Sequence, residues 1–237
     1  MLEIEHLHKS FGEKEVLHDI SIHVPDGKIV GFIGKNGAGK TTTLRCACGI
    51  LEFEQGSVTI GGIDLRKHPM DAKRMLAYLP DNPDLYDGLT ALQYISFVAD
   101  IFGVSASDRK RRITKYAQQM EIYDRLGDPI RTMSHGTKQK VAIISALVHA
   151  PKLLILDEPF VGLDPESAYH LKQNMKEICD HGGSVFFSSH VLDVVENLVD
   201  GLVVIRDGTI LFDGPRNALL QDYASLEEAF LSLEAHA

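Results

Sequence analysis

A glycine-rich segment at residues 34–41 constrains this chain most, because it reads G-K-N-G-A-G-K-T and fits the pattern G-x-x-x-x-G-K-[ST]. Residues 28–33 before it are typical of a strand, and residues 41–48 after it lack Gly and Pro and favour a helix. Glycines let backbone N–H groups face a phosphate chain, and the helix N-terminus adds unpaired donors and about half a positive charge. The segment therefore predicts a phosphate-binding loop, with a chance glycine turn as the alternative.

Two acids and a histidine follow later apolar strands. Residues 152–156 form a continuous apolar run, typical of a strand buried on both faces of a sheet, and Asp157 and Glu158 end it. Acids there lie at the carboxyl edge of the sheet, where α/β proteins bind ligands. We expect Asp157 to hold a hydrated Mg²⁺ and Glu158 to orient or deprotonate a water, although two solvated strand-end acids are the alternative. His190 follows another apolar strand and is expected at the same edge, near Glu158.

Composition limits the classes of function. The formal net charge of −9 argues against nucleic-acid binding, which usually needs a basic face. The one basic cluster, residues 109–112, is expected to solvate one side of a helix. Three cysteines show neither disulfide nor metal spacing, which suits a reducing compartment. No signal pattern and no apolar run of about 18 residues is visible, so any membrane role is expected to come through a partner.

The order of the predicted elements indicates an α/β chain with a helical insertion. β-like runs at 2–7, 16–24 and 29–33, separated by turn sequences, predict an N-terminal antiparallel layer leading into the phosphate loop. Apolar residues then recur every three or four positions from 90 to 124, with a break at 103–105, which predicts two helices. The sequence also predicts a strand at 75–79, a helix after His190 that runs through Leu198, and a hairpin at the Asp-Gly of residues 207 and 208. We predict a single domain over 1–237, whose parts are a β-layer and core at 1–89 and 150–214, a helical subdomain at 90–149 and a helical tail at 215–237.

In this order the motifs resemble those of the ATP-binding subunit of an ABC transporter, over nearly the whole chain. They are the loop at 34–41, Ser134-His135-Gly136-Thr137, the strand ending at Asp157 and Glu158, Gly162-Leu163-Asp164, and His190. The resemblance implies a P-loop NTPase fold with a RecA-like mixed sheet, with ATP and Mg²⁺ as cofactors. It implies in-line attack of water on the γ-phosphate, assisted by the catalytic residues Lys40, Glu158 and His190.

The resemblance also assigns the binding residues. Phe11 corresponds to the aromatic that stacks on adenine, although a turn aromatic covering the β-layer is the alternative. Asp164 corresponds to the acid of the D-loop. The Mg²⁺ ligands implied are Thr41, Asp81 and Asp157. The nucleotide-binding residues implied are Phe11, Gly34, Lys35, Asn36, Gly37, Ala38, Gly39, Lys40, Thr41, Thr42, Ser134, Gly136 and Asp164.

Two positions depart from the family's pattern. The signature LSGGQ reads Met-Ser-His-Gly-Thr here, so His135 replaces a glycine and Thr137 replaces a glutamine. Ser134 and the Gly136 backbone remain able to face a phosphate at a helix N-terminus, while the β-carbon of His135 restricts the backbone. Asp81 stands where the family usually has a glutamine, and a carboxylate can bind Mg²⁺ or its waters but cannot donate as an amide does.

The resemblance implies partners. Two copies, or this chain and a related subunit, are expected to pair head to tail, each ATP lying between one phosphate loop and the other chain's signature. A membrane-spanning permease is expected to dock near Asp81 to Thr90, which places the chain in the cytoplasm on the inner face of the cell membrane. The C-terminal extension, with residues 225–231, is similar to that of exporter-type subunits that pair with ABC-2-like permeases. The alternative is an amphipathic tail that simply packs against the domain. The rival functions are an ATPase acting on ribosomes or DNA, and a regulatory module that holds ATP without hydrolysing it.

Overall fold

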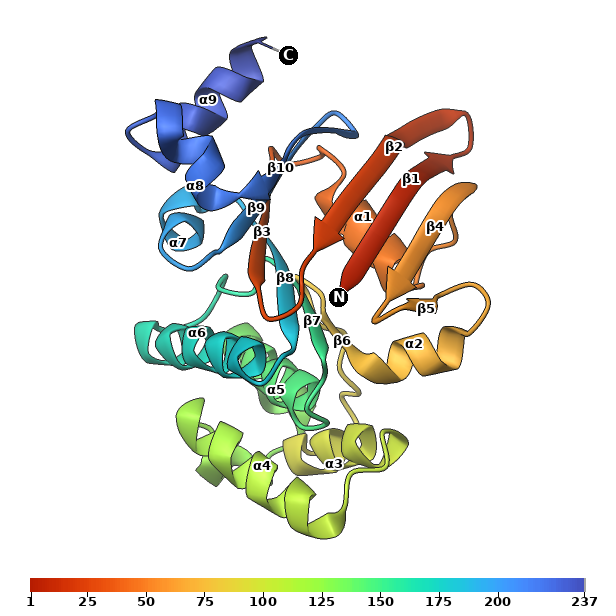
Figure 1. Cartoon of the computed structure of the whole chain (residues 1–237). Coiled ribbons are helices and arrows are strands. Elements are labelled where there is room, and N and C mark those ends of the chain that lie inside the picture. Colours follow the sequence, from red (N-terminus) through yellow and green to blue (C-terminus); the bar gives the residue numbers. More distant parts are fainter. Residues whose placement is uncertain (237) are drawn as a thin grey trace.

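The computed structural model describes residues 1–236, so Ala237, the last residue of the predicted tail, lies outside the described residues. Near the N-terminus, four antiparallel strands form one sheet in the order β2-β1-β4-β5 (Figure 1). This sheet is the predicted β-layer, except that the predicted run at 29–33 belongs to the second sheet. The strands of the layer are β1 (Leu2–Phe11), β2 (Lys14–Val24), β4 (Gln55–Ile60) and β5 (Ile63–Asp64).

The second sheet has six strands in the order β10-β9-β3-β8-β7-β6. Its strands are parallel except that β10 runs antiparallel to β9, so the sheet is mixed, as predicted. The antiparallel pair forms the hairpin expected at the Asp-Gly turn. The strands are β3 (Ile29–Ile33), β6 (Leu76–Leu79), β7 (Leu153–Asp157), β8 (Ser184–Ser189), β9 (Gly201–Arg206) and β10 (Thr209–Pro215).

Both faces of the central strands are covered. Phe32 and Phe186 stack at 5.2 Å between ring centroids and pack into the core shared with the β-layer. The next residue, Phe187, points to the other face and packs into the core shared with the helices. Because neighbouring residues of a strand face opposite sides, burial on both faces demands apolar residues at every position. This explains the continuous apolar runs in the sequence and fixes where the polar residues that follow each strand emerge.

Helices form the opposite end of the molecule from the C-terminal helix (Figure 1). A capping box at Thr90 and Gln93 starts α3, and the Ser105 side chain caps α4, which gives the predicted break between these helices its physical cause. Within the described residues, no helix is both long and apolar enough to cross a membrane. The helices before β7 are α1 (Lys40–Ala47), α2 (Pro69–Met75), α3 (Ala91–Ile101), α4 (Ala106–Gln119) and α5 (His135–Leu147), with short 3₁₀ turns η1 (Tyr123–Arg125) and η2 (Ile130–Thr132).

Two sequence predictions differ from the structure. Helix α2 was not predicted, and Met75, assigned to a strand from the sequence, is its last residue. Seven residues are too few for helical periodicity to stand out, although Pro69 at the first helical position is a typical start signal. The helix expected to run to Leu198 ends at Glu196. The helices after β7 are α6 (Pro165–Asp180), α7 (Leu192–Glu196), α8 (Arg216–Leu219) and α9 (Leu226–His236), with the 3₁₀ turn η3 (Leu220–Asp222).

Candidate functional site

The glycine-rich loop joins β3 to α1, as the sequence predicts, and two of its glycines adopt backbone conformations that other residues rarely take. Gly37 has φ 84° and Gly39 has φ 112°. Gly34 is required for space, because a β-carbon there would lie 2.4 Å from the Ile205 carbonyl oxygen. The loop is therefore held against β9 in one shape, with the first turn of α1 behind it.

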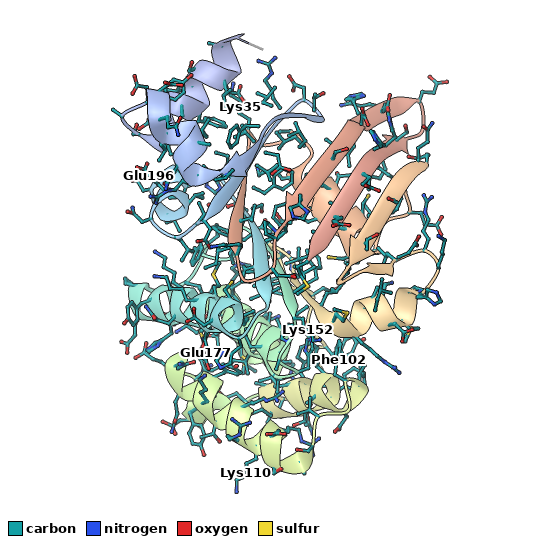
Figure 2. The ribbon with its side chains drawn as sticks, viewed as in Figure 1. Lys35, Phe102, Lys110, Lys152, Glu177 and Glu196 are labelled. Atoms are coloured by element: carbon teal, nitrogen blue, oxygen red, sulfur yellow. The ribbon has the colours of Figure 1, made fainter. Side chains whose placement is uncertain are left out.

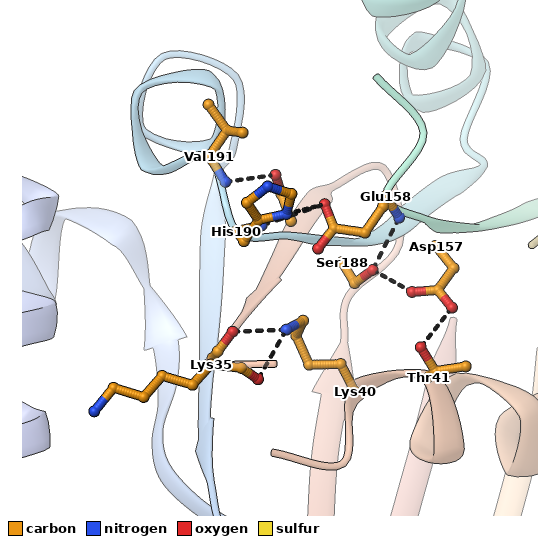
Figure 3. A network of polar contacts seen from close by, with 10 residues as sticks. Lys35, Lys40, Thr41, Asp157, Glu158, Ser188, His190 and Val191 are labelled. Atoms are coloured by element: carbon orange, nitrogen blue, oxygen red, sulfur yellow. Dashed lines mark hydrogen bonds and ion pairs between the residues drawn. The ribbon is translucent and has the colours of Figure 1, made fainter. Parts of the chain in front are cut away.

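The Lys40 side chain folds back onto this loop. Its Nζ donates to the carbonyl oxygens of Gly34 at 2.6 Å and Lys35 at 3.2 Å (Figure 3). Burial lowers the pKa of this ammonium, while the nearby charges of Glu158 and Asp157 oppose the shift. The ammonium is thus a buried positive charge beside the glycines and facing two carboxylates, which suits a phosphate ligand.

Asp157 lies at the end of β7 and is almost completely buried. Its Oδ2 accepts from the Thr41 hydroxyl at 2.7 Å, and its Oδ1 accepts from the Ser188 hydroxyl at 2.6 Å. A hydroxyl and a carboxylate that already touch are two hard oxygen ligands of the kind Mg²⁺ prefers. Thr41 and Asp157, both predicted Mg²⁺ ligands, are therefore brought together by the fold.

Ser188 was missed in the sequence, although it connects the two acids. Its Oγ accepts from the Glu158 backbone N–H at 3.0 Å while donating to Asp157 (Figure 3). Its position in the sequence could have revealed it, because Ser188 lies near the end of an apolar strand that is parallel to the strand carrying the acids. Parallel neighbours end at the same edge, so such a hydroxyl reaches whatever the adjacent strand presents there.

Glu158 has a different partner from Asp157, as alternation along a strand predicts. One carboxylate oxygen of Glu158 lies 2.9 Å from His190 Nδ1 and accepts from the His190 backbone N–H at 3.3 Å. Glu158 itself has φ 48°, in the left-handed region that few non-glycine residues occupy. This strained turn directs the carboxylate toward His190, so the predicted pair of Glu158 and His190 is present in the structure.

Two predicted ligand-binding residues stand apart from this network. Asp81 is exposed just beyond the end of β6, and no residue in the described range 1–236 makes a hydrogen bond or ion pair with its side chain. Phe11, at the end of β1, is half exposed, and Lys9 Nζ lies 5.2 Å from its ring centroid. The roles of Asp81 as a Mg²⁺ ligand and of Phe11 as an adenine platform stay predictions.

The signature residues lie at the start of α5. The Ser134 hydroxyl caps this helix by accepting from the Thr137 N–H at 3.3 Å. A β-carbon at Gly136 would lie 2.8 Å from the Gly162 carbonyl oxygen, and a β-carbon at Gly162 would lie 3.5 Å from His135 Cδ2. Position 136 therefore requires glycine for close packing, whereas the His135 side chain finds room in the exposed turn.

Asp164 caps α6 and pairs with Lys140 of α5, whose Nζ lies 2.5 Å from its carboxylate. The hydrogen bond from Lys140 holds the pKa of Asp164 well below its usual range. Within residues 1–236, no hydrogen bond or ion pair joins the signature or D-loop residues to the phosphate loop or to the acids of β7. In a single chain these residues form two separate polar clusters.

Comparison with known proteins identifies the family. The model of the ABC transporter family matches residues 17–161, which is more than half of the chain. This chain belongs to the ABC transporter family. Among its relatives, the linearmycin resistance ATP-binding protein LnrL of Bacillus subtilis is 33% identical, over 92% of this chain and 70% of that protein. The ABC-type transporter ATP-binding protein EcsA of the same organism is 31% identical, over 98% of this chain and 96% of that protein.

A solved ATP-binding subunit of an ABC transporter matches with a TM-score of 0.95 at 32% identity, over 99% of both chains. This agreement confirms the predicted P-loop NTPase fold with its RecA-like core, β-layer and helical insertion. The chain is thus an ATP-binding and ATP-hydrolysing subunit of an ABC transporter and uses ATP with Mg²⁺. EcsA is named as a transporter ATP-binding protein and the solved structure as a transporter subunit, which favours the predicted transport function over the ribosomal and DNA-acting rivals.

Proposed function

We propose that hydrolysis takes place at the edge where β7 and β8 end. Glu158, directed by its pairing with His190, orients and deprotonates the attacking water. Lys40 turns from the loop carbonyls to the β- and γ-phosphates, and His190 donates to a γ-phosphate oxygen. Mg²⁺, held by Thr41 and Asp157, would neutralise charge on the phosphates. The observation that carries this proposal is the network that joins Thr41, Asp157, Ser188, Glu158 and His190 beside the phosphate loop.

The test is to separate ATP binding from turnover. Glu158→Gln keeps the size of the side chain but removes the base, so Mg-ATP binding is expected to remain while hydrolysis slows by about 10²-fold or more. Lys40→Ala is expected to weaken nucleotide binding itself, because the buried ammonium is lost. Wild-type turnover in Glu158→Gln would refute the role of the base, and wild-type affinity in Lys40→Ala would refute the phosphate loop.

We also propose that the working unit is a head-to-tail pair of single-domain chains spanning 1–237. Ser134, Gly136 and Asp164 would then complete the partner's site, which accounts for two polar clusters that remain apart within one chain. A structural neighbour with the same fold, of 21% identity and TM-score 0.81, is described as a dimer bound to ADP and phosphate, which supports the proposal by analogy. The His135 and Thr137 departures would then affect the partner's ATP.

Membrane partners belong to the proposal as well. We expect a permease to dock at the surface between Asp81 and Thr90, where Tyr86 is 59% exposed and leads to the exposed apolar side chains Leu92 and Phe97 of α3. This docking would hold the chain on the cytoplasmic face of the membrane. The name of LnrL, a resistance protein, supports export as the direction. Co-purification of a membrane protein with the wild type, and its loss in Tyr86→Asp, would support this surface.

A further inference from the structure

The second residue of the phosphate loop is paired with the C-terminal helix. Lys35 Nζ lies 2.6 Å from the Glu234 carboxylate of α9, although the two residues are 199 positions apart in the sequence. Figure 2 shows Lys35 beside the C-terminal helices, and Figure 3 shows its side chain pointing away from Lys40. The loop side chain is therefore held away from the phosphate side of the loop.

Glu234 is buried, with 7% of its side chain exposed, whereas 69% of the Lys35 side chain is exposed. The Oε1 of Glu234 is buried without a hydrogen-bond partner among the described residues, and its Oε2 forms the ion pair with Lys35. A buried carboxylate is costly unless it is paired. The Glu234 backbone carbonyl also accepts from the Arg206 guanidinium at 2.8 Å, which fixes this turn of α9 against the end of β9.

The other end of α9 is fixed to the helix that follows His190. The Leu226 N–H donates to the Glu196 carboxylate of α7 at 3.0 Å, and the Arg216 guanidinium donates to the Glu196 carbonyl. Leu226 and Ala229 are fully buried in the core beneath. Helix α9 thus bridges the phosphate loop and α7, labelled by Glu196 in Figure 2.

We infer that Glu234 is a positioning residue for nucleotide binding, and that α9 is a brace for the phosphate loop. The inference rests on the proposed role of this loop. Lys35 is the point of action, because its side chain is held by Glu234 while its carbonyl accepts from Lys40. Because Lys35 is already fixed, the loop loses less conformational entropy when nucleotide binds. Helix α9 therefore raises the affinity of the loop for nucleotide.

Nucleotide binding and the docking of α9 are coupled, and the coupling acts in both directions. If α9 raises the affinity of the loop for nucleotide, then nucleotide must stabilise the docking of α9 by the same factor. Mg-ATP is therefore expected to slow amide hydrogen exchange in α9, which lies outside the chemistry of hydrolysis. A helix that only completes the core would lack this response.

The test compares Glu234→Gln with Glu227→Gln, a matched control on an exposed face of the same helix. We expect Glu234→Gln to raise the KM for ATP and the Kd for Mg-ATP roughly tenfold, within the usual range of coupling between sites, with kcat changed less than about twofold. Glu227→Gln is expected to keep wild-type values. A purely structural loss would instead lower the active fraction and kcat without changing KM.

A second pair of variants tests the contact itself. Lys35→Ala is expected to raise the Kd for Mg-ATP, and adding Glu234→Gln to it should have little further effect, because the two residues act through one contact. Unchanged KM and Kd in Glu234→Gln, additive effects in the double variant, or no nucleotide-dependent protection of α9 would each overturn the inference. These results are distinguishable from failure of the proposed function, in which the wild type and Lys40→Ala would bind Mg-ATP equally.

Discussion

At the scale of single residues, the site depends on a few hydroxyls and carboxylates at one sheet edge. Ser188 joins Asp157 to the backbone of Glu158, and it therefore holds the Asp157 carboxylate and the turn from which the Glu158 side chain projects. The strained backbone of Glu158 needs such support, because a left-handed conformation persists only when its surroundings hold it. The chemistry proposed for Glu158 thus depends on a neighbour that does not itself react.

Ser188→Ala is expected to raise the Mg²⁺ concentration that half-saturates ATPase activity by about tenfold, the usual effect of removing a group that orients a metal ligand. The physical reason is that Asp157 loses the donor on its Oδ1 and gains freedom to rotate. A Mg²⁺ titration of ATPase activity measures this effect. Ser145→Ala, which removes a buried hydroxyl bonded only to its own helix, is the control. An unchanged Mg²⁺ requirement in Ser188→Ala would contradict the role.

At the scale of elements, a stacked pair of rings within the helical insertion contacts the core at the start of β6. His149, just beyond α5, stacks on Phe102 at the end of α3 with ring centroids 3.7 Å apart. Its Nε2 lies 3.3 Å from the Leu76 carbonyl oxygen at the start of β6. Burial lowers the pKa of His149 to about 4, although that hydrogen bond opposes the shift. The imidazole is therefore neutral in the folded state at neutral pH.

This neutral histidine makes stability depend on pH. Below about pH 6.5 the unfolded chain binds a proton at His149, whereas the folded chain binds it only near pH 4, so stability falls as the pH decreases through this window. Between pH 7 and pH 5 the loss is on the order of 1–2 kcal/mol. In His149→Gln this contribution is expected to disappear, which urea unfolding at both pH values would measure.

The exposed His68, replaced by Gln, provides the control for this experiment. Its replacement should leave the difference in unfolding free energy between the two pH values as large as in the wild type. An equal pH dependence in the wild type and in His149→Gln would show that the buried imidazole does not carry the effect.

At the scale of the whole molecule, the proposed site is shared between two chains. Lys40→Ala damages the phosphate loop, and Ser134→Arg blocks the exposed signature, which in the proposed pair faces the partner. Each variant alone is expected to be inactive. In a mixed dimer, one site combines the intact loop of one chain with the intact signature of the other.

Mixing the two inactive variants in equal amounts is therefore expected to restore about a quarter of the wild-type ATPase activity, because random pairing gives half mixed dimers with one intact site of two. A steady-state ATPase assay of the mixture, after exchange of subunits, measures this recovery. Each variant mixed with itself is the control. If the mixture stays as inactive as its components, the sites are not shared as proposed.

The features that depend on local chain geometry could be predicted from the amino-acid sequence. The phosphate loop is visible because Gly37 and Gly39 need conformations that favour glycine, and the core strands are visible because burial on two faces excludes polar residues. The acids at the end of β7 follow from the same pattern. These signals are short in range, so they survive without knowledge of the fold.

Contacts between residues far apart in the chain depend instead on how the elements pack. The hydrogen bond of Ser188 to Asp157 and the ion pair of Glu234 with Lys35 are contacts that no periodicity encodes, because they join elements far apart in sequence. Helix α2 escaped prediction since it is too short for a periodic signal. Chain order therefore revealed the parts of the nucleotide site, whereas the packing of β7, β8 and α9 around the loop decided how those parts are held.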